Sequence, residues 1–424
     1  MLKQLILENW KSFRYAELPL DPLTVLIGTN ASGKSNVVEA LEFLQRIARG
    51  ENIETALAGD KTLPSIRGGV EWAARKPETK FTLKALVQGE DEQADYLYVI
   101  NIQTLQLVKI LEEYIEFKLF TENRVFNYID TINTINLRNY FPSNISGLKE
   151  VKIGHIEIEE NLEIHEILNK NKEINDEEFE KIYNKFLALK HQGKNFIIDA
   201  LENILILNPI PSKMRDYSHL CESIKSDASN IASVLVALPD EQKAEVESTL
   251  STYIKQLAAG GIQKVWAEED SELRRGAMLY YQEEWKKGYN LPKIDARSMS
   301  DVTLRFLAIF TALLTRPEGS QIVIEEIDNG LHPSRAELLV RILREIGEKR
   351  KIDILLTTHN PALLDALGPE IVPFVVVAHR DSETGESKLT LLEDIDNFSK
   401  LFASYSLGDM TTKGAIERSL SRNE

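Results

Sequence analysis

The sequence contains a single cysteine, Cys221, among its 424 residues. One cysteine excludes an internal disulfide and a cysteine-built metal cluster, and we expect it to be a small buried apolar side chain. The sequence also lacks any apolar run of the roughly 18 residues that a membrane span needs, and its N-terminus lacks the apolar stretch of a signal peptide. These absences predict a cytoplasmic protein with no membrane partner.

Positive charge is also scarce, with 50 Lys and Arg residues against 66 Asp and Glu and a formal net charge of -16. This balance disfavours indiscriminate coating of DNA, although it says nothing about a local basic patch. There is no internal repeat and no Pro- or Gly-rich linker. The length allows two or three domains around a large core.

The apolar pattern predicts an α/β head. Leu23 to Ile27 reads as a buried strand, followed by a loop and an amphipathic helix from Ser35 to Ala48. Between Phe81 and Phe117 the alternation has period two, which is typical of antiparallel strands. The last third alternates helices (Thr303 to Leu314 and Ser334 to Ile346) with apolar strands (Gln321 to Ile324, Ile354 to Leu356 and Phe374 to Val377). Such alternation predicts a parallel sheet with helices on its faces.

A change of composition interrupts this head. From about Lys118 to Lys194 the chain is rich in Asn, Glu, Ile and Lys, and Glu177 to Lys190 fits one amphipathic helix. We interpret this stretch as a short, partly helical inserted arm. The expected parts are an N-terminal lobe of the head (1–117), the arm (118–203), a C-terminal lobe of the head (204–380) and a C-terminal segment (381–424).

Gly28 to Ser35 reads G-T-N-A-S-G-K-S, which matches the phosphate-loop pattern G-x-x-x-x-G-K-[ST]. The glycines let backbone N–H groups turn toward phosphate oxygens, Lys34 neutralises the β- and γ-phosphates, and the Ser35 hydroxyl is a ligand for Mg²⁺. The helix N-terminus adds partial positive charge. Because the pattern lies between a buried strand and an amphipathic helix, it predicts ATP and Mg²⁺ binding.

Two further strands end in chemistry-bearing residues. Gln321 to Ile324 leads into Glu325 and Glu326, so Glu325 is the candidate Mg²⁺ ligand and Glu326 the candidate general base for the attacking water. His359 follows another strand and is a candidate to contact the γ-phosphate. Ser300 or Asp301, by contrast, needs no more explanation than a polar cap at the start of an apolar helix.

Several of these motifs, in this order, resemble the ABC-type ATPases of the SMC/RecF branch. The segments that carry the resemblance are E-N-W-K-S-F (8–13), the phosphate loop with Asn36, S-D-V-T-L-R (300–305), I-E-E-I-D-N-G-L-H-P (324–333) and T-T-H-N-P (357–361). The resemblance covers the head and not the arm. It implies a P-loop head with a mixed sheet flanked by helices and an antiparallel β-subdomain.

The resemblance also implies that two heads sandwich two ATP molecules in a homodimer or a higher homo-oligomer. Ser300 and Asp301 would then act in trans on the partner's nucleotide, and Asp328 would lie on a loop near the interface, together with Asn329, His332 and Pro333. Nucleotide contacts are expected from Lys11, Ser12, Gly28, Asn30, Ala31, Ser32, Gly33, Lys34, Ser35, Asn36 and Asp328. The catalytic residues would be Glu326, His359 and Lys34, and the metal ligands Ser35 and Glu325.

The sequence departs from the family pattern at two places. We call the segment S-D-V-T-L-R (300–305) the signature. In it Val302 replaces the glycine of the family pattern, and the Cβ of Val302 would hinder backbone approach to a γ-phosphate. Ile327 and Asp328 replace Pro and Glu, a milder change. The first departure predicts slow turnover and keeps a non-hydrolysing binding module as an alternative.

The arm is too short for the long coiled coils of chromosome-organising members. Compact heads of this kind resemble the ATPase components of the Septu, PARIS and retron anti-phage systems. This resemblance implies a sensor and scaffold that controls a separate effector, a nuclease or toxin. The alternative is a RecF-like repair or recombination ATPase that binds DNA when it dimerises with ATP. A transporter subunit is disfavoured, because transporters usually carry Asp-Glu where this chain has Glu325 and Glu326.

Overall fold

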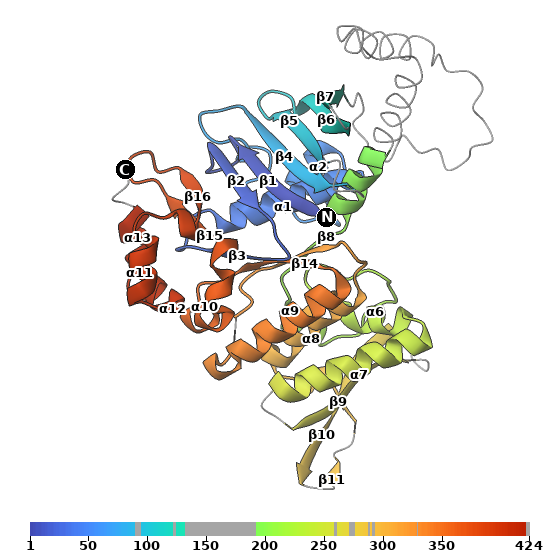
Figure 1. The fold of residues 1–424 in the computed structure, drawn as a ribbon. Helices are drawn as coiled ribbons and strands as arrows, with labels where there is room; N and C mark the ends of the chain where they lie inside the picture. Colours follow the sequence, from blue (N-terminus) through green and yellow to red (C-terminus); the bar gives the residue numbers. More distant parts are fainter. Residues whose placement is uncertain are drawn as a thin grey trace, which may run out of the picture. The chain divides into compact units, whose positions relative to one another are not determined.

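The computed structural model describes residues 1–89, 95–121, 124–131, 192–257, 261–270, 276–286, 289–290, 293–328 and 330–420. Its contacts divide the chain into two compact units (Figure 1). The first comprises Met1, residues 3–42 and residues 203–424, and the second comprises Leu2 and residues 43–202. The first unit contains residues of both predicted lobes of the head. We describe each unit by itself.

A six-stranded sheet forms the centre of the first unit, with the order β16-β15-β3-β14-β13-β8. Five strands run parallel, namely β3 (Leu23–Ile27), β8 (Ile204–Leu207), β13 (Gln321–Ile324), β14 (Asp353–Thr357) and β15 (Val375–Arg380). Only β16 (Ser387–Leu391) is antiparallel to its neighbour. The predicted parallel sheet is therefore confirmed. The antiparallel strand β16 makes it a mixed sheet, as also predicted.

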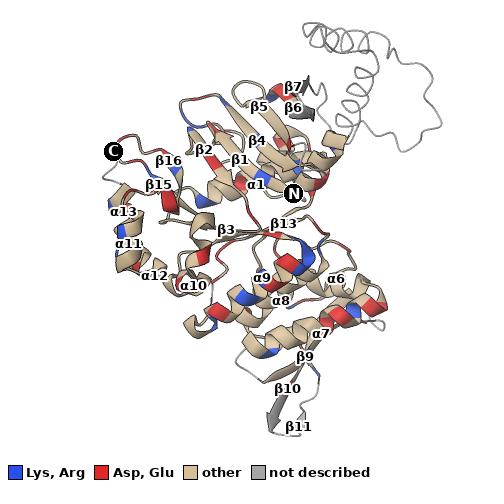
Figure 2. Cartoon of the chain, in the orientation of Figure 1, with Lys and Arg blue, Asp and Glu red and all other residues tan. Residues whose placement is uncertain are grey.

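The strands of this sheet are apolar because they are covered on both faces. Every residue of β8, β13 and β14 is buried, as expected for parallel strands between helical layers. The main covering helices are α8 (Asp301–Thr315), α9 (Ala336–Arg350) and α10 (Pro361–Leu367). In Figure 2 the central strands are almost free of charge, whereas α7 and α9 carry many of the charged side chains.

A second, smaller sheet precedes the signature segment in the chain. It consists of β9 (Ile262–Asp270), β10 (Gly276–Lys286), β11 (Tyr289–Asn290) and β12 (Ile294–Asp295), all paired through β10. Helices α5 (Pro211–Met214), α6 (Ile231–Ala237) and α7 (Asp240–Leu257) belong to the same unit.

Cys221 lies between α5 and α6 and is half-buried, with its Sγ 3.4 Å from the carbonyl oxygen of Ser223. The expectation of a fully buried cysteine is therefore wrong.

The N-terminal hairpin of the first unit consists of β1 (Leu2–Glu8) and β2 (Tyr15–Pro19), which pair antiparallel. Helix α1 (Lys34–Ala48) begins in the first unit and ends in the second. The second unit contains α2 (Ile53–Ala58), the antiparallel strands β4 (Lys80–Gln88), β5 (Asp95–Gln103), β6 (Lys109–Thr121) and β7 (Arg124–Thr131), and a helical stretch at 192–202. The predicted period-two strands are thus present, and they extend beyond Phe117.

The arm proposed for 118–203 largely escapes description. Its predicted helix, Glu177 to Lys190, lies outside the described residues. In the described part of the arm, β6 and β7 continue the antiparallel sheet to Thr131. The four-part division of the chain therefore stays a prediction at this point.

The C-terminal segment is helical, which the sequence analysis did not predict. It forms α11 (Phe398–Ser404), α12 (Leu407–Thr412) and α13 (Ala415–Leu420) after the edge strand β16. These helices are short, and their apolar residues join the core of the first unit. Among the described residues, no helix combines the length and apolar character that crossing a membrane requires.

Candidate functional site

The phosphate loop connects β3 with α1, and its backbone requires both glycines. Gly28 has φ +145°, and a Cβ at this position would lie 2.1 Å from the carbonyl oxygen of Ala378. Gly33 has φ +116°, and its Cβ would lie 2.8 Å from the ring of Phe13. Side chains are thus excluded by strain and by contact. The loop lies against neighbouring segments and keeps the curled backbone that phosphate binding needs.

Lys34 lies in the concavity of this loop. Its Nζ donates hydrogen bonds to the carbonyl oxygens of Gly28 (2.6 Å) and Thr29 (3.0 Å). Burial lowers the pKa of Lys34, while the negative charge of Glu326 acts in the opposite direction. The ammonium is therefore partly desolvated and within electrostatic reach of the candidate base, which places the two residues at one site.

The remaining loop residues differ in exposure. Asn30 and Ala31 are exposed, and Ser35 is half-buried in the first turn of α1. Ser32 is 1% exposed, and its Oγ has no hydrogen-bond partner among the described residues. A buried hydroxyl without a partner is costly in an apolar interior. Here it supplies a free donor inside the loop, which suits an anionic phosphate oxygen.

Trp10, Ser12 and Asn36 form a hydrogen-bonded support behind the loop. Trp10 Nε1 donates to the carbonyl oxygen of Asn36 (2.7 Å), and Asn36 Nδ2 donates to Ser12 Oγ (2.7 Å). Ser12 Oγ also lies 2.7 Å from Ser387 Oγ. The side chains of Ser12 and Asn36 therefore bind each other, and their predicted contact with the nucleotide stays a prediction.

Lys11 is occupied within the same unit. Its Nζ lies 2.5 Å from Glu39 Oε2, and both side chains are nine-tenths or more buried. Breaking a buried ion pair leaves a desolvated charge and is strongly unfavourable. The ammonium of Lys11 is thus paired with Glu39 of α1, and the predicted approach of Lys11 to the nucleotide stays a prediction.

The acidic pair follows β13 directly. Glu325 is half-buried, and its N–H donates to the carbonyl oxygen of Leu207 on the adjacent strand (3.4 Å). Glu326 is exposed, has φ +47°, and donates its N–H to Thr357 Oγ1 at the end of β14 (3.0 Å). A left-handed conformation is uncommon for a residue with a long side chain. The hydrogen bond holds this turn, and with it the candidate base, against the neighbouring strand.

We call Thr357 to Pro361, which contains His359, the switch segment. It lies between the phosphate loop and the acidic pair, because β14 is inserted between β3 and β13 in the sheet. Thr358 Oγ1 donates to Asp328 Oδ1 (2.6 Å), and both residues are buried. His359 is exposed and lines a cavity of about 150 Å³ together with Gly28 and Thr29. The parallel topology therefore brings Lys34, Glu326 and His359 to one edge of the sheet, as the sequence predicts.

Asp328 has a clear role within its own chain. Asp328 is 7% exposed, and its carboxylate accepts a hydrogen bond from the hydroxyl of Thr358. The bond uses one of the two carboxylate oxygens, and the predicted contact of Asp328 with nucleotide stays a prediction. Asn329, the next residue of the predicted interface loop, lies outside the described residues.

Ser300 is the N-cap of α8. Its Oγ accepts a hydrogen bond from Thr303 N (3.1 Å) and lies 2.8 Å from Thr303 Oγ1. Asp301 pairs with Arg215, whose Nη2 lies 2.6 Å from Asp301 Oδ1. The capping interpretation is therefore confirmed. The role of both residues on a partner's nucleotide stays a prediction.

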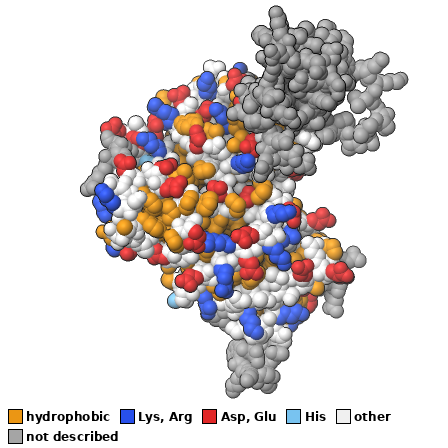
Figure 3. All heavy atoms as spheres, viewed as in Figure 1, with side chains coloured by type: hydrophobic (Ala, Val, Ile, Leu, Met, Phe, Trp, Pro, Cys, Tyr) orange, Lys and Arg blue, Asp and Glu red, His pale blue; other side chains and the backbone are white. Residues whose placement is uncertain are grey.

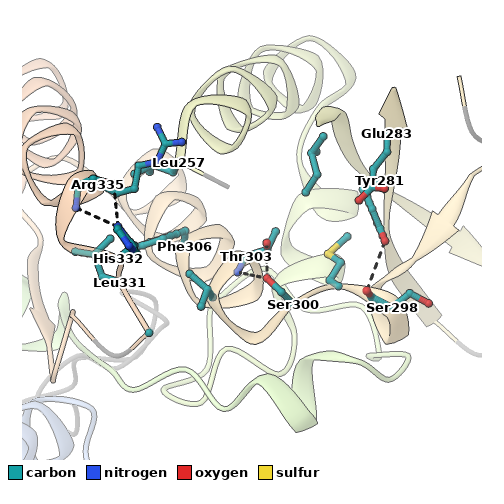
Figure 4. A pocket seen from close by; sticks show the side chains of 15 residues that line it. Leu257, Tyr281, Glu283, Ser298, Ser300, Thr303, Phe306, Leu331, His332 and Arg335 are labelled. Atoms are coloured by element: carbon teal, nitrogen blue, oxygen red, sulfur yellow. Dashed lines mark hydrogen bonds between the residues drawn. The ribbon is translucent and has the colours of Figure 1, made fainter. Parts of the chain in front are cut away.

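A cavity of about 580 Å³ lies beside Ser300 (Figure 4). Figure 4 shows Tyr281 and Glu283 of β10 on one side of the start of α8, and Leu331, His332 and Arg335 on the other. Tyr281 donates its hydroxyl hydrogen to the carbonyl oxygen of Ser298 (3.5 Å). The serine of the signature thus borders a hollow that is large enough for a ligand group or for part of another chain.

Val302, which replaces the signature glycine, contacts the loop after the acidic pair. Gly330 has φ +82°, and a Cβ at this position would lie 2.7 Å from Val302 Cγ2. In the same loop, His332 Nδ1 accepts a hydrogen bond from Ser334 N (3.3 Å). The substitution at Val302 is therefore accommodated by packing on a glycine in the same chain.

Sequence reasoning missed several contributors to this edge. The hydroxyls of Thr357 and Thr358 tie the acidic turn to the switch, and the T-T-H pattern was the available signal. Tyr281, Glu283 and Arg335 were not predicted, because they reach the cavity from two segments, β10 and the stretch after His332, that have no shared motif. Such positions depend on tertiary packing and have no local sequence signal.

The donor chemistry at the edge suits Mg²⁺. Ser35 offers a hydroxyl at the start of α1, and Glu325 offers a carboxylate at the end of β13. Among the described residues there is no group of three or more His, Cys, Asp or Glu side chains that could hold a metal. Nucleotide-bound Mg²⁺ usually takes one or two protein oxygen ligands together with phosphates and water. Ser35 and Glu325 would hold it.

Comparison with solved structures finds distant likenesses to SMC heads. The SMC head domain from Thermotoga maritima has 14% sequence identity and a TM-score of 0.43, covering 92% of this chain and 98% of that chain. An SMC head with an extended coiled coil, bound to the C-terminal domain of ScpA and derived from Pyrococcus furiosus, has 14% identity and a TM-score of 0.41, with coverages of 95% and 99%. No curated protein matches the chain.

The family assignment has a separate basis. The family model described as "AAA domain, putative AbiEii toxin, Type IV TA system" matches residues 23–365. This range begins at β3 and ends within α10, so it includes the phosphate loop, the acidic pair and the switch histidine. The chain belongs to this family of AAA domains.

Proposed function

We propose that the protein hydrolyses ATP with Mg²⁺ at the carboxyl edge of the central sheet. The observation that carries this proposal is the position of Glu326, which is held by Thr357 and acts electrostatically on Lys34. A general base must lie close to the phosphates that the lysine binds. The family assignment supports the same reaction.

In the proposed reaction, Glu326 takes a proton from water as the water oxygen attacks the γ-phosphorus. The bond between the γ-phosphorus and the bridging oxygen breaks, and ADP leaves with that oxygen. Lys34 and the N–H groups of the phosphate loop stabilise the charge on the phosphates, and His359 orients the γ-phosphate and the water. Bound Mg²⁺, held by Ser35 and Glu325, would neutralise negative charge on the phosphates.

Glu326→Gln tests the chemical step. We expect this variant to keep ATP binding and to lose turnover by roughly 10²–10⁴-fold, the usual contribution of a general base. Lys34→Ala is the matched control, because it should lose binding itself. ATP affinity and phosphate release measured on the same preparations distinguish the two variants. Unchanged turnover in Glu326→Gln would remove Glu326 from the role of base.

We further propose that two heads pair around ATP, with Ser300 of one head completing the site of the other. The cavity beside Ser300 supports this arrangement, since it leaves the N-terminus of α8 accessible from outside the chain. Glu326→Gln should then accumulate as a dimer with ATP, which light scattering measures. Lys34→Ala should stay monomeric under the same conditions.

Mixing two inactive variants provides a sharper test of pairing in trans. A Ser300→Arg head and a Glu326→Gln head together contain one intact composite site. It is formed by Glu326 of the first head and Ser300 of the second. Turnover should therefore reappear on mixing and approach that of a single site per dimer. Two variants that stay inactive together would show that each head works alone.

For the biological role, we propose a sensor and scaffold that controls a separate effector, a nuclease or toxin, in anti-phage defence. The family's description, which refers to a toxin and a toxin–antitoxin system, supports this role. The net charge of -16 disfavours DNA as the main ligand, and acidic and basic side chains are interspersed on the face in Figure 3. The protein would act as an ATP-gated oligomer.

Purification together with the products of its neighbouring genes tests this role. A toxin-like chain at a fixed ratio, identified by mass spectrometry and released or retained according to ATP, would support the scaffold. A lone protein that dimerises with ATP and then binds DNA ends or gaps would replace it with the RecF-like repair function. Native mass with and without ATP separates these outcomes.

A further inference from the structure

The C-terminal helices α12 and α13 are built into the head. Leu407, Met410, Ala415 and Ile416 are each 4% exposed or less. All four belong to the same core cluster as Val25 and Ile27 of the phosphate-loop strand. Residues 407–420 lie beyond the family match, which ends at residue 365. This segment is therefore an integral part of the first unit for which the family assignment gives no role.

Helix α12 makes a close contact with α10, the helix that begins two residues after the switch histidine. Gly408 N donates to Asp365 Oδ1 (2.7 Å). A Cβ at Gly408 would lie 2.3 Å from the carbonyl oxygen of Pro361, the first residue of α10. Helices α10 and α12 lie side by side (Figure 1). Their backbones approach closely at Gly408 and Pro361, and the hydrogen bond to Asp365 joins them.

Helices α12 and α13 border the edge of the sheet at which we propose that ATP binds. The cavity of about 150 Å³ that Gly28, Thr29 and His359 line is completed by Thr411, Thr412, Ile416 and Glu417. One wall of the space beside the phosphate loop and the switch histidine therefore belongs to the C-terminal segment. A displacement of α12 would change both this wall and the support of α10.

We propose that Asp365 is a positioning residue for hydrolysis, which clamps α12 to α10 and thereby holds His359 at the γ-phosphate side of the site. This inference depends on the proposed ATPase activity. The short path from Asp365 to His359 carries it: α10 spans Pro361–Leu367, and Asn360 caps it through a hydrogen bond from Ala362 N to its Oδ1 (2.9 Å). Small misplacements of catalytic groups reduce turnover strongly.

The test compares Asp365→Ala with Asp365→Asn. Alanine removes the acceptor for Gly408 N, whereas asparagine keeps a carbonyl oxygen in its place. We expect Asp365→Ala to lower kcat about 3- to 30-fold, the range that couplings between neighbouring residues produce. ATP affinity should stay the same. Asp365→Asn should restore most of the wild-type kcat, which a variant that merely fails to fold would not.

A double-mutant cycle with His359→Ala determines whether the effect passes through the histidine. If Asp365 acts by positioning His359, the alanine substitution should cost nothing further in the His359→Ala background. An equal cost in both backgrounds, or no loss of kcat in Asp365→Ala, would overturn the proposal. Thermal unfolding of all four proteins serves as the folding control.

A measurement without turnover separates this proposal from the proposed function. In histidine-labelled protein, the His359 imidazole resonance, assigned through His359→Ala, should shift in Asp365→Ala and stay in place in Asp365→Asn. An unshifted resonance would overturn the clamp even if ATP is hydrolysed. A shifted resonance in a protein without ATPase activity would support the clamp and refute hydrolysis.

Discussion

Thr358 Oγ1 donates a buried hydrogen bond to Asp328 Oδ1 over 2.6 Å. The bond joins two loops that the sequence separates by 30 residues, one after β13 and one after β14. A second bond, from Glu326 N to Thr357 Oγ1, joins the loop after β13 to the last residue of β14. Adjacent threonines at the end of one strand therefore join the acidic turn to the segment that contains His359.

The first prediction concerns Thr358→Val, which keeps the shape of the side chain and removes the hydroxyl. Asp328 would be left with a buried carboxylate oxygen lacking this partner, at a cost of about 1–3 kcal/mol in the free energy of unfolding. We also expect lower turnover, because the two loops lose a connection. Urea denaturation and phosphate release measure both effects.

Thr358→Ser is the matched control for this change, since it keeps the hydroxyl. It should retain turnover and most of the stability. A Thr358→Val protein as stable and as active as the wild type would show that the bond to Asp328 contributes nothing to the site.

The second prediction concerns the proposed Mg²⁺ ligands. Ser35→Ala and Glu325→Gln should each weaken ATP binding about tenfold in the presence of Mg²⁺, since each removes one oxygen ligand of the ion or its charge. Without Mg²⁺, in a chelator, affinity should differ little from the wild type. Titration calorimetry under both conditions gives the comparison. An equal loss in the chelator would indicate that these residues support the loop instead of the metal.

Sequence patterns predicted four strands of the parallel sheet because each is a short apolar run, and three of them, β3, β13 and β14, end in a motif. The phosphate loop, the acidic pair and the switch histidine were placed on one edge by topology alone, and the structure brings Lys34, Glu326 and His359 there. Parallel strands leave little freedom in this respect, since their carboxyl ends share an edge.

The parts that escaped prediction depend on contacts between distant segments. One such part is the ion pair of Lys11 with Glu39 on α1, which no local sequence pattern indicated. Helices α12 and α13 have six residues each, which is too few for a helical period to be recognised. The docking of α12 on α10 depends on the absence of a side chain at Gly408, and the sequence does not show that Gly408 lies against Pro361.

The third prediction concerns the departure from the family signature. Val302 Cγ2 lies where a side chain at Gly330 would have to fit. Val302→Gly should remove this contact and the Cβ that hinders approach to a partner's γ-phosphate, so we expect ATP-dependent dimerisation and turnover to rise. Replacing valine by glycine in the first turn of α8 should cost about 0.3–0.5 kcal/mol in helix propensity. Val302→Ala separates the loss of the contact from the loss of the Cβ.

If Val302→Gly and Val302→Ala raise turnover equally, the contact with Gly330 is the restraint. If neither raises it, the slow turnover expected from the signature has another cause. Gly330→Ala should be destabilising in either case, because φ is +82° and the added Cβ would lie 2.7 Å from Val302 Cγ2.

The last prediction concerns a buried acid in the second unit. Tyr98 donates its hydroxyl hydrogen to Glu113 Oε1 (2.7 Å), and Glu113 is 4% exposed. Burial raises the pKa of Glu113 to about 7, although the hydrogen bond from Tyr98 acts in the opposite direction. The folded protein therefore keeps a proton on Glu113 that the unfolded chain loses near its ordinary pKa of 4.5. Because the folded state binds more protons in this range, stability falls as pH rises from about 5 to 7.

Glu113→Gln removes this titration and keeps a side chain of the same size, so it should flatten the fall in stability. At pH 8 we expect the variant to be more stable than the wild type by about 1–3 kcal/mol, and at pH 4.5 the two should differ little. Tyr98→Phe is the control, because it removes the hydroxyl that stabilises the ionised carboxylate and should extend the fall in stability to higher pH. Chemical denaturation at several pH values between 4.5 and 8 measures all three proteins. An unchanged slope in Glu113→Gln would show that another group is responsible for the pH dependence.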